Sequence, residues 1–138
     1  TVQAAEADKV RAELSAQLLA MTDPSNAKRP ILRVARSKDI YAETRRSEAP
    51  DLVIGYDVGY GASDQSTLGE IVELWIEDNT SRWSGNHLMA PEVVPGVLLT
   101  NRPVKASGYD LLDVTSTVLS HYNLPNGPGQ SGESVFSP

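Results

Sequence analysis

The feature that most constrains the fold of this chain is a short apolar run, Leu52-Val53-Ile54, which lies between Pro50 and Gly55. A run of this length, β-branched at two positions and bounded by turn-forming residues, predicts a buried strand over residues 51–56. The glycine-rich residues that follow, 57–64, predict a turn at the end of that strand. They do not form a phosphate-binding loop, because such a loop needs a lysine followed by Ser or Thr.

Two further segments have helical periodicity. Apolar residues recur at spacings of three and four over residues 4–21, and Pro24 ends that pattern. A second helix is expected to begin at Asp110 or Asp113 and to run to Tyr122, because either carboxylate can accept the free amides of a first helical turn.

Other segments indicate strands. Alternation over residues 31–36 predicts a short strand, and the compact apolar run within residues 97–100 predicts another. Residues 66–79 fit a helix or a strand equally. Helices and strands that alternate along a chain favour an α/β domain.

The length of 138 residues suits one domain with its own core. We expect that domain to span residues 1–125. The remaining residues, 126–138, are rich in Gly, Ser and Pro, and this composition predicts an extended or mobile tail.

Composition excludes several classes of protein. The net charge of −6 and the scattered Lys and Arg residues argue against binding to a nucleic-acid duplex, which needs clustered positive charge. The absence of cysteine excludes disulfides and thiolate zinc sites. No apolar run approaches the roughly 20 residues that a membrane span requires. The compartment stays open.

Histidine is the clearest candidate for chemistry, since neutral imidazole is a common metal ligand and a common acid or base. The chain has two histidines. His87 follows a glycine turn in the stretch from Trp83 to Pro103 and is the first place to look. The alternative is a loop histidine that only hydrogen-bonds its neighbours. His121 falls at a helix end, where its charge suits the helix dipole.

Other polar and aromatic residues are weaker candidates. The aspartates of the glycine-rich loop could contact substrate or a residue that binds metal, and those of the second helix could bind metal, although capping explains them more simply. Two threonines in that helix are expected to pack or cap rather than to act as nucleophiles. Trp83 could line a cleft or lie half-buried in a loop. The aspartates and threonines are Asp57, Asp64, Asp110, Asp113, Thr115 and Thr117.

Three stretches, in this order, resemble the C-terminal part of the alkaline phosphatase superfamily, in its branch of type I phosphodiesterases and nucleotide pyrophosphatase-like proteins. APDLVIGY at residues 49–56 is similar to the strand before the last active-site loop. WSGNH with MAPEVVPGVLLTNRP resembles the Gly-x-His loop and its following strand. The stretch from Leu112 to Leu119 and the ending Leu124-Pro125 resemble the terminal helix.

The resemblance implies an α/β/α sandwich, of which this chain would form the C-terminal portion, with few strands flanked by helices. It also implies hydrolysis of phosphate or related esters by a Thr or Ser nucleophile and two divalent metals, usually zinc. His87 occupies the position of the family's metal-binding histidine, so His87 is the one metal ligand that we assign. No catalytic residue is assigned, and the substrate-binding residues are unknown.

The departures from the family pattern limit what this chain can do alone. The nucleophile and the other metal ligands of the family lie upstream, whereas a catalytic zinc needs about three protein ligands. We therefore expect this chain alone to be inactive and to bind no metal tightly. Many relatives have Asp before the histidine, where this chain has Asn86.

The expected partners are the remainder of the parent chain, a small phosphate ester, and further copies of the fragment if its apolar surface is uncovered. Two alternatives stay open. The chain could be a non-catalytic accessory or degenerate interaction domain. It could also be part of a sulfatase or a phosphosugar mutase of the same superfamily.

Overall fold

A computed structural model describes residues 2–71, 73–83, 85, 87–105 and 108–136. Their contacts divide the chain into two compact units, Thr1–Pro95 and Gly96–Pro138. Each unit is described by itself. The boundary between them falls inside the range 1–125 that was expected to form one domain. The described residues form both helices and strands, which is compatible with the expected α/β class.

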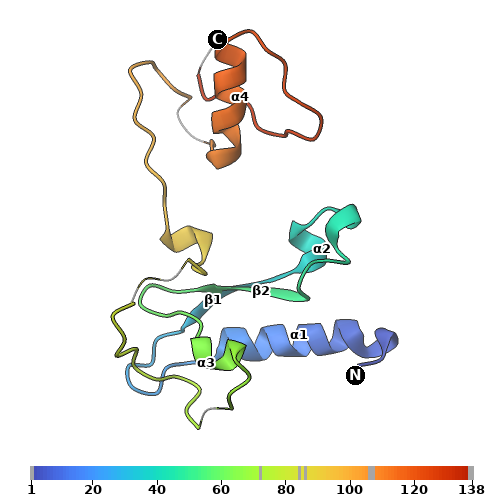
Figure 1. Cartoon of the computed structure of the whole chain (residues 1–138), viewed down its shortest axis with the longest axis vertical. Coiled ribbons are helices and arrows are strands. Elements are labelled where there is room, and N and C mark those ends of the chain that lie inside the picture. The colour runs from blue at the N-terminus through green and yellow to red at the C-terminus, as the bar shows by residue number, and fades with distance from the viewer. Residues whose placement is uncertain (1, 72, 84, 86, 106–107, 137–138) are drawn as a thin grey trace. The chain divides into compact units, whose positions relative to one another are not determined.

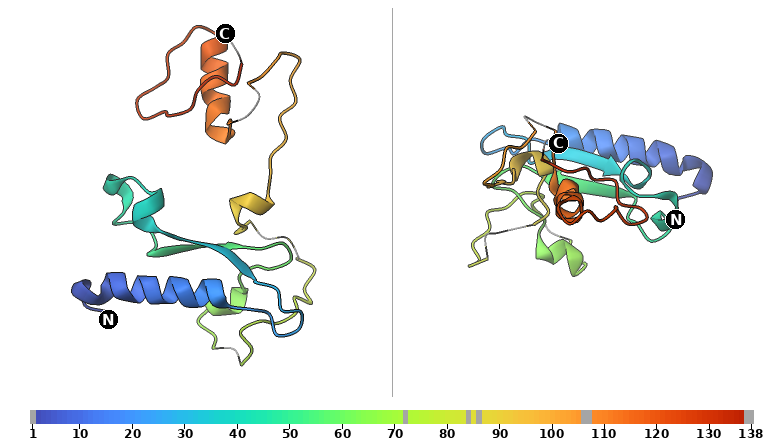
Figure 2. Two further views of the ribbon diagram at one scale, coloured as in Figure 1. Left: turned by 180° about the vertical axis from the view of Figure 1, so that it is seen from behind. Right: turned by 90° about the horizontal axis from the view of Figure 1, so that it is seen from above.

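A long helix and two strands form the main part of the first unit. Helix α1 spans Ala4–Ala20, strand β1 spans Ile31–Arg36 and strand β2 spans Leu52–Tyr56, so these elements are confirmed. The burial predicted for β2 is wrong: Gly55 is buried and the other residues of the strand are half-buried, because β2 has one paired strand and a single bridge beside it. The strands are antiparallel and pair from Ile31 with Tyr56 to Arg36 with Leu52, and an irregularity in the register lies between Ile31 and Arg33. Figures 1 and 2 show α1 running beside this pair of strands.

Helix α1 is only partly covered by the strands. The apolar residues Ala7, Val10, Leu18 and Met21 are half-buried, and Leu14, on the same predicted stripe, is 45% exposed. The helix has 17 residues and is about 25 Å long, whereas two strands lie only about 5 Å apart. A sheet this narrow cannot cover the whole stripe. None of the helices among the described residues is long and apolar enough to cross a bilayer.

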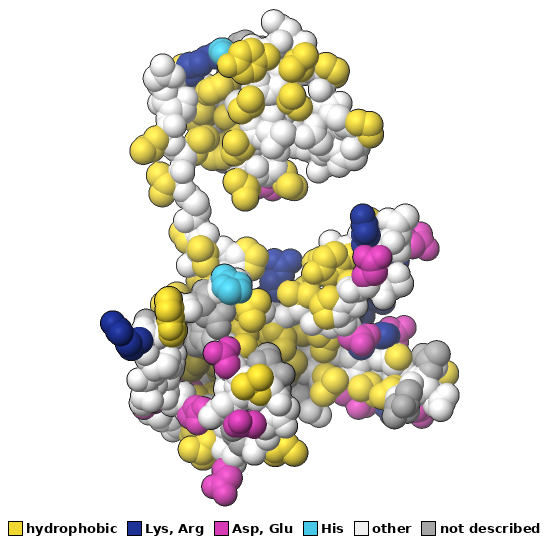
Figure 3. Space-filling model, in the orientation of Figure 1, with side chains coloured by type: hydrophobic (Ala, Val, Ile, Leu, Met, Phe, Trp, Pro, Cys, Tyr) yellow, Lys and Arg dark blue, Asp and Glu magenta, His cyan; other side chains and the backbone are white. Residues whose placement is uncertain are grey.

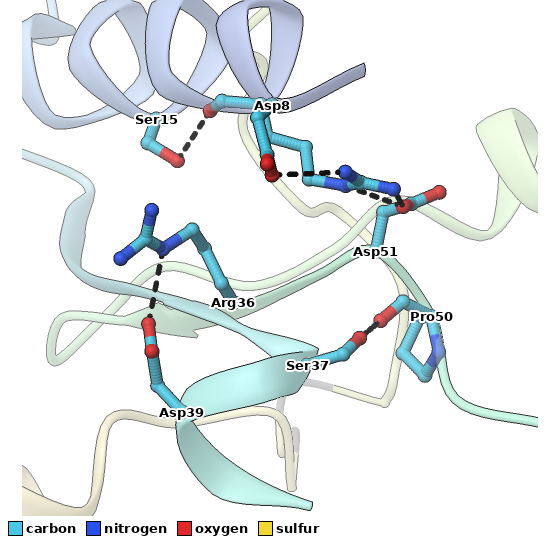
Figure 4. A network of polar contacts seen from close by, with 8 residues as sticks. Asp8, Ser15, Arg36, Ser37, Asp39, Pro50 and Asp51 are labelled. Carbon is cyan, nitrogen blue, oxygen red and sulfur yellow. Dashed lines mark hydrogen bonds and ion pairs between the residues drawn. The ribbon is translucent and has the colours of Figure 1, made fainter. Parts of the chain in front are cut away.

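Polar contacts join α1 to the connection between the strands, which contains α2 (Ser37–Ile40) and the 3-10 helix η1 (Glu43–Arg45). The Arg11 Nε donates to Asp51 Oδ1 at 2.7 Å, just before β2. The Ser37 hydroxyl donates to the Pro50 carbonyl at the other end of the connection (Figure 4). Because the ion pair between Arg11 and Asp51 is exposed, it contributes little stability.

Between β2 and residue 95 the first unit has two short helices, α3 (Asp64–Thr67) and the 3-10 helix η2 (Pro91–Val93). Of residues 66–79, which fit a helix or a strand, only 66 and 67 are helical, at the end of α3, and the other described residues form neither. Ile71 is 100% exposed and Leu68, Leu74 and Trp75 are also exposed, while Ile76 is half-buried, so most described apolar residues of this segment pack little within the unit.

The second unit is built on helix α4, which spans Leu111–His121 and confirms the predicted terminal helix. Asp110 is its N-cap: Asp110 Oδ1 accepts from Leu112 N at 2.7 Å, and Asp113 Oδ2 accepts from Asp110 N at 2.9 Å. This reciprocal pair is a capping box, and it assigns a capping role to both aspartates.

The strand predicted over residues 97–100 is wrong. These residues have no regular structure, and Val97 and Leu99 are 86% and 89% exposed. A strand forms when a neighbour satisfies its backbone hydrogen bonds, and no strand of the described residues pairs with this segment. The apolar run therefore crosses the surface unpaired.

The tail returns onto α4. Gly132 is buried and lies so close to the first turn of α4 that a Cβ on it would stand 2.3 Å from the Leu112 carbonyl oxygen. Val135 N donates to the Thr117 hydroxyl at 2.9 Å, and Phe136 pairs with Val104 in an antiparallel bridge. These contacts bury Val135, the one apolar residue in the core of the described part of this unit.

One further pairing widens the sheet of the first unit. Tyr56 forms an isolated parallel bridge with Met89, with hydrogen bonds from Tyr56 N to Leu88 O at 3.2 Å and from Ala90 N to Tyr56 O at 2.9 Å. Ala90 is completely buried beside Gly55. A Cβ on Gly55 would lie 2.8 Å from the Ala90 Cα, so this position requires glycine for space.

We expect Gly55→Ala to lower the free energy of unfolding by roughly 1 to 3 kcal/mol, because the added methyl forces apart two backbones that cannot yield as side chains do. Gly96→Ala is the matched control, since a Cβ there meets nothing within 4 Å. Urea unfolding followed by circular dichroism measures both. Equal stability of the two variants would contradict the close packing of Gly55 on Ala90.

Candidate metal-ligand site

His87 lies in the loop that leads into the Tyr56–Met89 bridge. It stands two residues before Met89, and its side chain is exposed. Because Leu88 O and Ala90 N both bond to Tyr56, the backbone directly after His87 is tied to the end of β2. The first two stretches on which the family resemblance rests are therefore neighbours in space, although residues 57–82 separate them in the sequence.

Asp57 is the predicted site residue that the structure brings to the same place. It follows Tyr56 directly, so Asp57 and His87 both lie within two residues of the bridge. Asp57 Oδ1 accepts from Val58 N at 2.7 Å, and Asp57 O accepts from Tyr60 N at 3.1 Å. The carboxylate thus shapes the turn after β2 and is positioned by it.

A polar network that sequence reasoning missed holds this turn in place. Asp23, 6% exposed, accepts from the Tyr60 hydroxyl at 2.7 Å, from the Ser25 hydroxyl at 2.7 Å and from Asn26 Nδ2 at 2.8 Å. The turn that follows α1 is therefore joined to the glycine-rich loop after β2. The donors satisfy a carboxylate that would otherwise be costly to bury.

The same contacts change the pKa values of the two groups that they join. Hydrogen bonds from Ser25 first, and from Tyr60 next, hold the pKa of Asp23 below its usual 3.8. The hydrogen bond to Asp23 raises the pKa of Tyr60 above its usual 10.0. Both shifts follow from one contact, because it favours the carboxylate of Asp23 and the neutral phenol of Tyr60 together.

The remaining predicted residues lie elsewhere. Asp64 begins α3. Trp83 is 87% exposed, and its carbonyl accepts from Asn79 Nδ2 at 2.7 Å, so it is neither half-buried nor part of a cleft wall among the described residues. Asn86 lies outside the described residues.

The other predicted residues belong to the second unit, where they support α4. Asp110 and Asp113 cap this helix. Thr117 is buried and donates to Asp113 O at 2.6 Å, as expected of a packing residue, and Thr115 is exposed on the helix. His121 is in the last turn of α4, as its place in the sequence predicts.

The described residues contain no group of three or more His, Cys, Asp or Glu side chains that could hold a metal ion. His87 can supply one imidazole nitrogen, and Asp57 is the acidic residue that the fold places beside the same bridge. A catalytic zinc takes about three protein ligands. His87 and Asp57 supply at most two of these ligands, so among the described residues they do not form a complete zinc site.

The Asp23–Tyr60 contact could not be found from sequence pattern. The string Asp23-Pro24-Ser25-Asn26 does signal a local turn stabilised by side-chain hydrogen bonds. Tyr60 lies 37 residues further on and carries no signal of its own.

The network predicts that stability falls at both ends of the pH range. A lowered Asp23 pKa stabilises the fold above pH 3.8, and this contribution is lost as pH falls through the folded-state pKa. A raised Tyr60 pKa stabilises the fold below pH 10.0, and this contribution is lost as pH rises through the folded-state pKa.

Asp23→Asn should therefore lose stability at pH 7 and approach the wild type near pH 2. Tyr60→Phe should lose stability at pH 7 and approach the wild type above pH 11. Exposed Tyr41→Phe is the control. Urea unfolding across the pH range measures all three, and a stability difference that does not depend on pH would contradict the network.

Comparison of this chain with protein-family models, with curated proteins and with solved structures gives no match.

Proposed function

We propose that this chain is the C-terminal segment of a metal-dependent phosphodiesterase or nucleotide pyrophosphatase-like hydrolase of the alkaline phosphatase superfamily, and that His87 supplies one metal ligand. In this proposal the chain forms one edge of an α/β/α sandwich. The nucleophile and the other ligands come from upstream residues, so the segment alone is inactive.

The observation that carries this proposal is the parallel pairing of Tyr56 with Met89. This pairing brings together β2 and the loop that contains His87, which are the two stretches that resemble the family's strand and Gly-x-His loop. It also places Asp57 and His87 at one end of β2. A histidine that is exposed at a strand end, with its backbone fixed immediately after it, is suited to complete a site built on adjacent strands.

The large accessible surface area of this chain supports the proposal that it is part of a larger protein. Its accessible surface is 11361 Å². Even two separate compact domains of 95 and 43 residues would together expose only about 8,300 Å², which leaves an excess of about 3,000 Å². A standard interface covers about 800 Å² per partner and an obligate one about 1,000 to 2,500 Å². Coverage by the remainder of a parent chain accounts for an excess of this size.

Many of the side chains on this surface are large and hydrophobic. Large hydrophobic residues are exposed in both units, including Leu111 at 84%. Figure 3 shows hydrophobic side chains spread over the visible face of each unit. The core of the described residues has three apolar members, Ile31, Ala90 and Val135. Leaving so much apolar surface in water is unfavourable, so these residues are suited to the interior of a larger protein.

The chemistry of the proposed site divides between the metals and this chain. When bound, divalent metals in such a site supply Lewis-acid stabilisation of the transferring group and a more acidic hydroxyl nucleophile. His87 contributes a neutral nitrogen donor on a loop anchored at Leu88 and Ala90. Gly55, which admits the Ala90 backbone, serves as a positioning residue for that loop.

The decisive experiment is His87→Ala in the longer protein that contains this segment. Loss of an outer hydrogen-bond partner of a ligand costs about 10- to 100-fold, so loss of the ligand itself should lower kcat/KM for a phosphodiester by more than about 100-fold. Bound zinc should fall in parallel, as metal analysis of the purified protein would show. Exposed Glu77→Ala removes a metal-binding residue type from the same unit and is the matched control.

Unchanged hydrolysis in the His87→Ala protein, with unchanged circular dichroism, would overturn the assignment. Activity assays against phosphate monoesters, phosphodiesters and sulfate esters separate a phosphodiesterase from a sulfatase. A longer protein with no metal-dependent hydrolysis of any of the three would favour a non-catalytic module.

A further inference from the structure

The second unit gathers its basic side chains at one place. Residues 96–138 contain one arginine, one lysine and one histidine: Arg102, Lys105 and His121. All three line a single surface hollow, together with Ser120, Ser134 and Glu133. The hollow therefore gathers the positive charge of this unit, although the chain as a whole carries a net charge of −6.

Arg102 is held in place without a carboxylate partner. Its guanidinium carbon lies 4.4 Å from the centre of the Phe136 ring, and its Nη1 lies 3.5 Å from His121 Nδ1. Within the part of the chain that the structure describes, no acidic side chain forms an ion pair with it. A fixed guanidinium of this kind presents its remaining N–H groups to an oxyanion at low entropic cost.

The neighbouring groups add donors of hydrogen bonds. When His121 Nδ1 accepts from Arg102, the neutral ring carries its proton on Nε2 and can donate it. The Ser134 hydroxyl accepts from Phe136 N at 3.3 Å, which leaves its own proton for another acceptor. Lys105 pairs with Glu133 at 3.4 Å, and because that glutamate side chain is 83% exposed, the pair is weak and can rearrange.

The backbone around the hollow is pinned by contacts that do not involve the basic groups. Lys105 N donates to Val135 O at 2.9 Å, and Val104 pairs with Phe136. Glu133 N donates to Asp113 Oδ1 at 2.7 Å, which ties the tail to the first turn of α4. The backbone positions that carry Lys105 and Ser134 are therefore fixed by contacts separate from the basic side chains.

We propose that this hollow binds a tetrahedral phosphate group, with Arg102 as the main anchor and Lys105, His121 and the two serine hydroxyls as further donors. Two cationic groups beside several N–H and O–H donors match a dianion with several acceptor oxygens better than they match a carboxylate. The Glu133 carboxylate and the negative C-terminal end of α4 both oppose an anion. Arg102 and Lys105 together carry two positive charges, which exceed the single charge of Glu133 plus the partial charge of about half a unit at the helix end. This site is independent of the proposed metal centre.

The test uses the 138-residue chain in EDTA, so that no divalent metal contributes. Inorganic phosphate is titrated while the imidazole signals of both histidines are followed by NMR. We expect saturable shifts at His121 and none at His87. Methyl phosphate distinguishes an esterified ligand from free phosphate, and acetate at equal ionic strength should bind at least tenfold more weakly than phosphate.

Arg102→Gln should weaken phosphate binding at least tenfold, and Arg102→Lys, which keeps the charge but not the planar donors, should lie between. Arg45→Gln is the matched control, since it makes the same change of charge at an exposed arginine of the first unit. Circular dichroism checks that each variant is folded. Equal shifts at both histidines, the absence of any shift at His121, or equal loss of binding in Arg102→Gln and Arg45→Gln would overturn the proposal.

Discussion

The contact on which the first unit depends is the close approach of two backbones, at Gly55 of β2 and Ala90 of the segment after the histidine loop. Space for that approach exists only because residue 55 has no side chain. The approach lets Tyr56 bond to Leu88 and Ala90, and this bonding extends a two-strand sheet and buries Ala90. The position of His87 follows from a missing methyl group rather than from any contact of its own side chain.

The helices and the paired strands could be predicted because local pattern and tertiary environment agree. Residues 31–36 and 52–56 find each other as partners, and Asp110 caps α4 as its residue type suggests. The apolar run at 97–100 has the composition of a strand but pairs with no strand among the described residues of its unit. Strand pairing needs two segments, so the composition of one segment cannot predict whether it will pair.

The candidate site shows the same limit. Residue type and loop make His87 a candidate, and a place in the glycine-rich loop makes Asp57 one. The burial of Asp23 beneath the Tyr60 hydroxyl could not be predicted, because it joins two loops whose separation in the sequence carries no periodic signal. Likewise, the grouping of Arg102, Lys105 and His121 arises from the return of the tail onto α4, and this return depends on the space that Gly132 leaves.

Two contacts of the first unit lie one inside the other along the sequence: the Asp23–Tyr60 contact encloses the Pro30–Asp57 contact. This arrangement implies an order in which they form. Strand pairing brings Pro30 and Asp57 together, with a bond from Asp57 N to Pro30 O at 3.0 Å. Asp23 precedes Pro30 and Tyr60 follows Asp57 in the sequence. Once Pro30 and Asp57 are together, only the short segments 24–29 and 58–59 remain to be closed into a loop by the Asp23–Tyr60 contact. Because the entropic cost of closing a loop rises only with the logarithm of its length, the outer contact adds little cost once the strands have paired. The Asp23–Tyr60 contact can therefore open and reclose while the strands stay paired, which makes the glycine-rich loop a unit of local unfolding separate from the sheet.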